Sequence, residues 1–123
     1  MSVPMSMPIL VVDDYSTMVR IVRNLLRQLG FQNVDDAADG AGALAKMRAR
    51  PYGLVISDWA MRGETGGDLL DEVRADAALR DTPVLMLTPG EGNDAASDAP
   101  CLSKPFNAAA LKKRLAALLG EEF

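Results

Sequence analysis

The sequence predicts an α/β fold in which helices cover both faces of a parallel sheet. Short runs of branched apolar residues alternate with segments whose apolar residues recur every three or four positions. The first pattern is typical of strands buried on both faces, and the second of amphipathic helices. Strands that alternate with helices indicate parallel pairing with right-handed crossovers. A length of 123 residues fits a single domain.

The first predicted elements are a strand at residues 9–12, which stops at Asp13 and Asp14, and a helix after it. The helix is predicted from an apolar face with the i, i+3, i+4, i+7 spacing. Ser16 is expected to cap this helix and Gly30 to end it. The residues of the apolar face are Met18, Ile21, Val22, Leu25 and Leu29.

The alternation then continues to a third strand. A short strand is expected near Val34, and Asp39 is expected to open a helix that runs to about Arg50. The apolar residues 54–57 indicate the next strand. Like the first strand, it stops at an acid, Asp58.

The rest of the chain supplies two more predicted strands and two more predicted helices. A glycine-rich stretch at 63–67 leads into a helix. Residues 83–88 and 101–103 are expected to form the fourth and fifth strands. Asn107 is expected to cap the final helix. We therefore expect one domain over 8–120, between tails of 1–7 and 121–123.

Charge and cysteine content exclude several classes of function. A net charge of -4 disfavours nucleic acid and anionic membranes as partners, because both are polyanions. The chain has no histidine and one cysteine, Cys101, which excludes an internal disulfide and a Cys/His metal site. Residues 1–7 lack the basic and apolar regions of a signal peptide, so we expect a cytoplasmic protein.

Five polar residues stand where predicted strands stop. Ligands bind at the carboxyl ends of the strands in such sheets, so we expect these side chains to meet at one edge. Each residue alone has an ordinary explanation, such as a helix cap, a turn or a solvated charge, and the prediction depends on the set. The five are Asp13, Asp14, Asp58, Thr88 and Lys104.

This set of residues suits phosphoryl transfer supported by Mg2+. Three carboxylates at one edge repel one another, and a divalent cation with oxygen ligands neutralises them. Asp58 can act as the nucleophile, while Asp13 and Asp14 hold the metal. Thr88 offers a hydroxyl and Lys104 an ammonium group for the phosphoryl oxygens. A cis bond before Pro105 would turn Lys104 toward the site.

Four segments together resemble bacterial response regulator receivers, and among these the chemotaxis CheY type. They are ILVVDDYSTMVRIVRNLL at 9–26, VISDW at 55–59, PVLMLT at 83–88 and KPF at 104–106. The resemblance implies a flavodoxin-like sheet of order 2-1-3-4-5 and phosphorylation of Asp58. It also implies Asp13, Asp14 and the Ala60 carbonyl as further magnesium ligands. Thr88 and Lys104 match the pair that grips the phosphoryl group.

The resemblance also implies partners. The phosphodonor would be a CheA-like histidine kinase, and the target a flagellar motor switch protein or another protein. A phosphatase is a further candidate partner, and the chain is expected to act as a monomer. Trp59, next to Asp58, is expected to report on metal binding and phosphorylation.

Two of the chain's departures from the family pattern bear on its output. The connection of 89–100 is shorter than in typical receivers and contains Pro89, Gly90, Gly92 and Pro100, so the fourth helix of the family is expected to be shortened or missing. Cys101 stands where chemotaxis regulators often carry a switching aromatic. Both departures favour a phosphate sink or relay that does not bind the motor as the alternative function.

Other interpretations have less support. A phosphatase of the haloacid dehalogenase type needs a second acid two residues after its nucleophile, where this chain has Ala60. An unphosphorylated scaffold would not need the acids, Thr88 and Lys104 together. Arg23 and Arg27 have a spacing that could suit a cyclic dinucleotide, but a solvated helix face is the simpler expectation.

Overall fold

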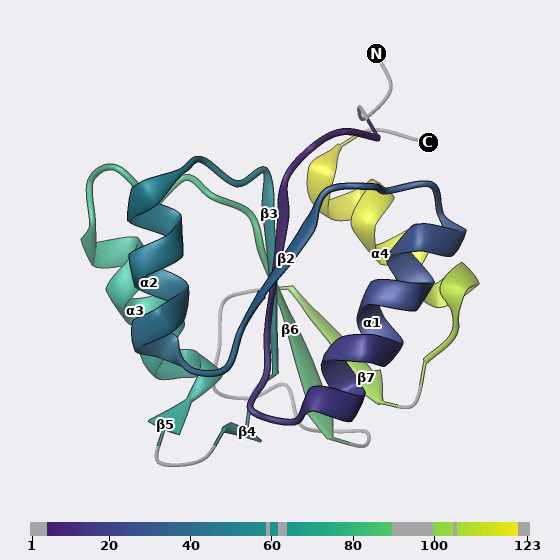
Figure 1. Ribbon diagram of the computed structural model, residues 1–123, viewed down its shortest axis with the longest axis horizontal. Coiled ribbons are helices and arrows are strands. Elements are labelled where there is room, and N and C mark those ends of the chain that lie inside the picture. The colour runs from purple at the N-terminus through teal and green to yellow at the C-terminus, as the bar shows by residue number, and fades with distance from the viewer. Residues whose placement is uncertain (1–4, 59, 62–63, 90–99, 105, 121–123) are drawn as a thin grey trace.

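The computed structural model describes residues 5–58, 60–61, 64–89, 100–104 and 106–120. A five-stranded parallel sheet stands between two pairs of helices (Figure 1). Its strands are β1 (Ile9–Val12), β2 (Val34–Ala37), β3 (Leu54–Asp58), β6 (Val84–Pro89) and β7 (Cys101–Lys104). The described helices are α1 (Ser16–Gln28), α2 (Gly40–Ala49), α3 (Gly66–Ala75) and α4 (Ala108–Leu119).

The strand order of the sheet is β2-β1-β3-β6-β7. Numbered along the chain, these five strands have the order 2-1-3-4-5, so the expected flavodoxin-like topology is confirmed. The central strands β1 and β3 pair in parallel with Val12 opposite Ser57. The residues that follow this pair, Asp13 and Asp58, are therefore level with each other at the carboxyl edge of the sheet.

Two apolar cores lie on opposite faces of the sheet. One lies beneath α2 and α3 and includes Leu10, Val12 and Val55. The other lies beneath α1 and α4 and includes Val11 and Ile56. Successive residues of a strand point to opposite faces, so a strand between two cores must be apolar along its whole length. This explains the uninterrupted apolar runs in the sequence.

Helix α1 differs from its prediction at two positions. Ile21 was expected in the apolar face but is 45% exposed, whereas Leu26 is fully buried. Ile21 lies about 100° around the helix axis from the buried Val22, while Leu26 lies one turn above Val22 on the same side. The N-cap is Tyr15 rather than Ser16, and it makes no side-chain capping bond.

The predicted caps of α2 and α4 and the predicted end of α1 are confirmed. Asp39 accepts a hydrogen bond from the Gly42 amide at 2.7 Å, and Asn107 accepts one from the Ala110 amide at 2.8 Å. Each bond satisfies one backbone donor that the first helical turn leaves free. Gly30 follows α1 with a φ of 107°, a conformation that favours glycine.

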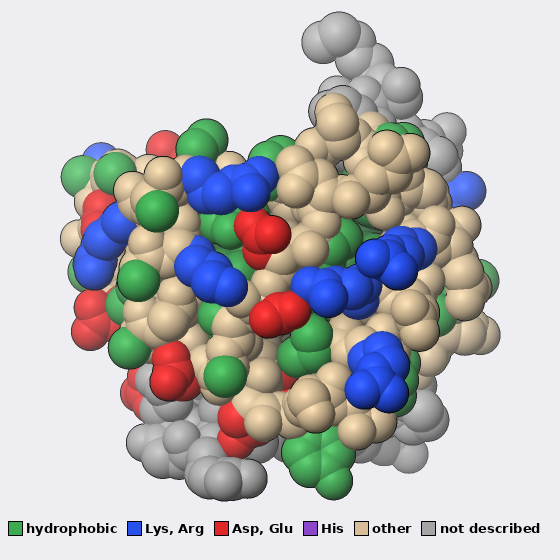
Figure 2. Space-filling view, viewed as in Figure 1, with side chains coloured by type: hydrophobic (Ala, Val, Ile, Leu, Met, Phe, Trp, Pro, Cys, Tyr) green, Lys and Arg blue, Asp and Glu red, His purple; other side chains and the backbone are tan. Residues whose placement is uncertain are grey.

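Polar and charged side chains from other elements form hydrogen bonds to the edge strand β2. Arg23 donates to the Val34 carbonyl at 3.2 Å and to the Asp36 carboxylate at 2.6 Å, and Lys46 donates to the Asp36 carbonyl. The carboxylate of Asp35 accepts from Tyr52 at 2.6 Å. Figure 2 shows basic side chains on both sides of the acidic ones on this face. The expectation that Arg23 is only solvated is therefore wrong.

The segment after β3 forms a ribbon that the sequence did not predict. Strands β4 (Ala60–Met61) and β5 (Glu64–Thr65) pair antiparallel, and α3 begins directly after them. Trp59 lies outside the described residues, as do 90–99, where the fourth helix was expected to be shortened or missing, and Pro105, for which the sequence left both the cis and the trans bond open. Within the described part of the chain, no helix combines the length and apolarity needed to cross a membrane.

We predict that Ile56→Ala lowers the free energy of unfolding by about 3 kcal/mol, because it opens a cavity in a fully buried strand. Ile21→Ala removes the same atoms from a side chain that is 45% exposed, and should cost less than about 1 kcal/mol. Urea unfolding of the two variants measures the difference. Equal losses would contradict the packing described above.

Candidate functional site

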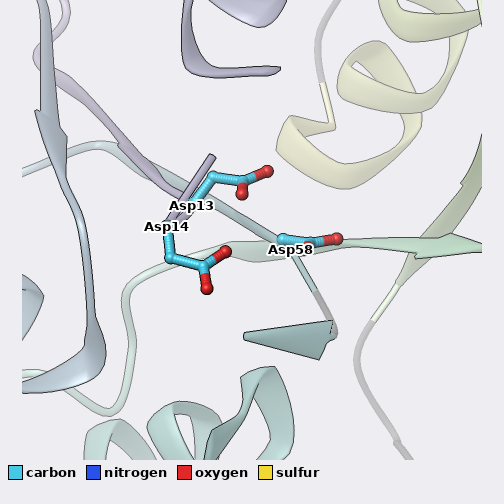
Figure 3. Close-up of side chains that lie close together, drawn as sticks. All are labelled: Asp13, Asp14 and Asp58. Carbon is cyan, nitrogen blue, oxygen red and sulfur yellow. The ribbon is translucent and has the colours of Figure 1, made fainter. Parts of the chain in front are cut away.

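Three carboxylates gather where β1 and β3 end. Asp13 and Asp14 follow β1, and Asp58 is the last residue of β3 (Figure 3). One ligand atom from each carboxylate lies within 4.8 Å of the other two. Asp13 and Asp58 are buried, and Asp14 is partly buried. The sequence prediction that these three acids meet at one edge is borne out by this geometry.

The carboxylate of Asp13 is incompletely satisfied by the protein. Its Oδ1 accepts a hydrogen bond from the Tyr15 amide at 2.9 Å. Its Oδ2 is buried and has no hydrogen-bond partner among the described residues. Burial raises the pKa of Asp13 from 3.8 to about 6, and the charges of Asp58 and Asp14 add to the increase, while the Tyr15 amide opposes it.

These features fit a divalent cation. A buried carboxylate oxygen without a donor is costly, and two neighbouring acids increase the cost. The donor set consists of oxygens only, which suits Mg2+ rather than zinc or copper. Asp13, Asp14 and Asp58 are therefore suited to hold a magnesium ion.

Lys104 reaches Asp58 from the far edge of the sheet. It is the last residue of β7, which β6 separates from β3. Its Nζ donates to Asp58 Oδ1 at 2.7 Å, and the Asp58 side chain is only 9% exposed. An ammonium group at this distance stabilises the ionised carboxylate. Asp58 thus has a cation on one side and two acids on the other.

Thr88 and Ala60 both lie close to Asp58, Thr88 across the sheet and Ala60 along the chain. Thr88 is buried in β6, one residue beyond Leu87, which pairs with Asp58. Ala60 lies in β4, two residues after Asp58. The structure thus places the backbone of both residues at the carboxyl edge of the sheet, next to the three acids.

Sequence reasoning missed two features next to the acids. The Tyr15 amide donates a hydrogen bond to the Asp13 carboxylate. An aspartate often accepts such a bond from the backbone amide two residues later. A cavity of about 290 Å³ also adjoins Asp13 and Asp14 and is lined on its other side by Arg20 and Arg23. The sequence offers no signal for this cavity, because it depends on how α1 sits against β2.

Comparison with known proteins identifies the family. Residues 9–116 match the response regulator receiver domain. The chain belongs to the response regulator receiver family. The chemotaxis protein CheY-3 of Vibrio cholerae is 45% identical to it over 116 residues, which cover 89% of each chain. The chain is therefore a CheY-like response regulator, a signalling protein rather than a catalyst.

Solved structures of other receivers have the same fold. Chemotaxis protein CheY4 of Vibrio cholerae superposes with a TM-score of 0.81 at 32% identity, covering 92% of this chain and 98% of that one. The receiver domain of a sensor histidine kinase from Pseudomonas aeruginosa gives a TM-score of 0.83 at 26% identity, covering 94% and 99%. That structure has a magnesium ion coordinated in its active-site cleft.

We predict that Asp13→Asn stabilises the magnesium-free receiver by roughly 2 kcal/mol, because it removes a buried charge from between two like charges. The amide oxygen of asparagine can keep the bond from Tyr15. Urea unfolding with and without MgCl2 measures both effects, and the variant should lose the added stability that Mg2+ gives the wild type. A less stable variant with an intact magnesium response would refute this assignment.

The raised pKa of Asp13 also predicts a pH dependence. The folded carboxyl binds its proton with a pKa of about 6 and the unfolded one with a pKa near 3.8, so this residue lowers the stability of the metal-free protein as pH rises through that window. Above about pH 6, Asp13 lowers the stability no further. The wild-type stability minus that of Asp13→Asn, followed by urea unfolding from pH 3.5 to 7.5, isolates this contribution. A flat difference would contradict the shift.

Proposed function

We propose that this receiver accepts a phosphoryl group on Asp58 from a histidine kinase and thereby switches its binding to a protein partner. The observation that supports this most is the contact of Lys104 with Asp58 at 2.7 Å beside two further acids. We further propose that residues 8–120 form the receiver unit and act as a monomer in the cytoplasm, without nucleic acid or a membrane as partner.

The proposed reaction begins with the carboxylate of Asp58. One of its oxygens attacks the phosphorus atom, the bond from phosphorus to the donor imidazole breaks, and the imidazole nitrogen takes up a proton. Burial of Asp58 keeps bulk water from competing at this carboxylate. The ammonium group of Lys104 lies 2.7 Å from Asp58 Oδ1, where it can offset negative charge as the phosphoryl group arrives.

Asp13, Asp14, Asp58 and the backbone carbonyl of Ala60 are the proposed magnesium ligands. Mg2+ supplies charge neutralisation for the phosphoryl oxygens and the acids. Two features support this assignment: the three carboxylates lie close together, and Oδ2 of Asp13 has no hydrogen-bond partner in the part of the chain that the structure describes. Asp13 itself is fixed by the Tyr15 amide, so its free oxygen has a defined direction.

Lys104 and Thr88 are proposed to bind the phosphoryl group after transfer. Once Asp58 is an acyl phosphate, the negative charge lies on the phosphoryl oxygens, and the ammonium group of Lys104 is close enough to pair with one of them. The hydroxyl of Thr88 would donate to a second oxygen. Thr88 lies in β6, between the strands of Asp58 and Lys104, so its movement would connect the site to the β7 edge of the sheet.

The output of the switch has two candidates. The similarity to chemotaxis proteins supports a flagellar motor switch protein as target and a CheA-like kinase as donor, with a phosphatase as a further partner. The partly buried Cys101, at the start of β7, instead favours a phosphate sink or relay, because it lacks the ring of a switching aromatic. Binding of the phosphorylated protein to a motor switch peptide separates the two.

We predict that Asp58→Asn abolishes phosphorylation while leaving the fold intact. In the wild type, Trp59 fluorescence should change on addition of MgCl2 and change again with beryllofluoride or a small phosphodonor. The second change should be absent in Asp58→Asn, because an amide is neither nucleophile nor anionic ligand. Asp81→Asn, which neutralises an exposed acid after α3, should behave like the wild type. A second change that survives in Asp58→Asn would overturn the proposal.

A further inference from the structure

The residues just before β1 are bound to the amino-terminal edge of the sheet. We call residues 5–8 the amino-terminal strap. The Gln32 amide donates to the Met5 carbonyl at 3.1 Å, and the Gly53 amide donates to the Pro8 carbonyl at 2.9 Å. The Asn33 side chain donates to the Ser6 carbonyl at 3.3 Å. Part of the expected tail is thus packed against the domain.

Two methionine side chains of the strap fill space that glycines leave open. The Sδ of Met5 lies 2.7 Å from where a Cβ atom would stand at Gly30, and Met7 occupies the corresponding place at Gly53. Both side chains also pack against the apolar core beneath α1 and α4. Each thioether therefore fills a space that is lined by a glycine and by apolar side chains. We call this space the seat of the thioether.

The strap methionines differ from the core methionines in their access to solvent. Met47 is 4% exposed and Met86 is fully buried, whereas Met5 and Met7 are only partly buried. Met5 and Met7 are therefore more accessible to an oxidant in solution than the core methionines are. The seats, by contrast, offer the sulfur atoms apolar contacts.

We propose that Met5 and Met7 are a reversible oxidation site that releases the strap. A lone pair on Sδ attacks one oxygen of hydrogen peroxide, the O–O bond breaks, a sulfoxide forms and water leaves. Sulfur loses two electrons and the peroxide gains them. A sulfoxide is a strongly polar acceptor, and burial against glycine and aliphatic carbon leaves it unsatisfied. A methionine sulfoxide reductase with a thiol reductant reverses the change.

The strap and the phosphorylation site lie at opposite edges of the sheet. The strap precedes the first residue of β1, whereas Asp13 follows its last residue. Release of the strap therefore lowers stability and frees the amides of Gln32 and Gly53, but leaves the acids in place. The inference does not depend on the proposed function.

Hydrogen exchange tests the proposal on the full chain. The wild type and a Met5→Leu/Met7→Leu double variant are treated with hydrogen peroxide, and oxidation at each methionine is followed by peptide mass spectrometry. Leucine preserves the apolar volume but cannot be oxidised. In the oxidised wild type, exchange at the Gln32 amide should rise roughly tenfold and Tm should fall by about 5 °C. The Asp13 amide, which donates to the Ala37 carbonyl, serves as the internal reference.

The double variant should show neither change under the same peroxide treatment. Treatment with the reductase should restore the wild-type exchange rate. The proposal is overturned if Met47 and Met86 are oxidised before Met5 and Met7. It is equally overturned if the double variant loses as much stability as the wild type, because the effect would then come from another methionine, such as the partly buried Met18.

Discussion

Repulsion among three carboxylates at one edge of the sheet is the constraint on which the rest of this receiver depends. Asp13, Asp14 and Asp58 stay within 4.8 Å of one another because β1 and β3, from which they extend, are fixed by the two apolar cores. The raised pKa of Asp13 reflects burial first, and then repulsion from Asp58 and Asp14. The fold holds the three carboxylates together even without a cation, at a cost in free energy. A bound cation would remove this cost, so the site favours cation binding.

Much of this arrangement could be predicted from the sequence, because strands between two cores must be apolar and end in polar residues. The strand at residues 9–12 was predicted with the bounds that the structure has. In a parallel sheet the carboxyl ends of the strands meet at one edge. The positions of Asp13, Asp58 and Lys104 followed from these two rules, and so did the contact between Lys104 and Asp58.

What could not be predicted depends on how elements pack against each other. Ile21 and Leu26 are both apolar, and the spacing alone did not show which of them faces the core. Arg23 of α1 was expected to be solvated, but its partner Asp36 lies in β2, thirteen residues later in the chain. The seats of Met5 and Met7 at Gly30 and Gly53 have no sequence signature at all, because a glycine is usually explained by its backbone conformation.

The two edges of the sheet have opposite physical characters, and this allows them to be controlled separately. The carboxyl edge concentrates negative charge, which a divalent cation would neutralise. At the amino edge, hydrogen bonds from Gln32 and Gly53 and the thioethers of the strap add stability without charge. Because the cores between the edges are closely packed, a change at one edge affects the other edge through the stability of the whole domain rather than through a local conformational change. Oxidation of the strap would therefore alter how much receiver is folded, whereas phosphorylation would alter what the folded receiver binds.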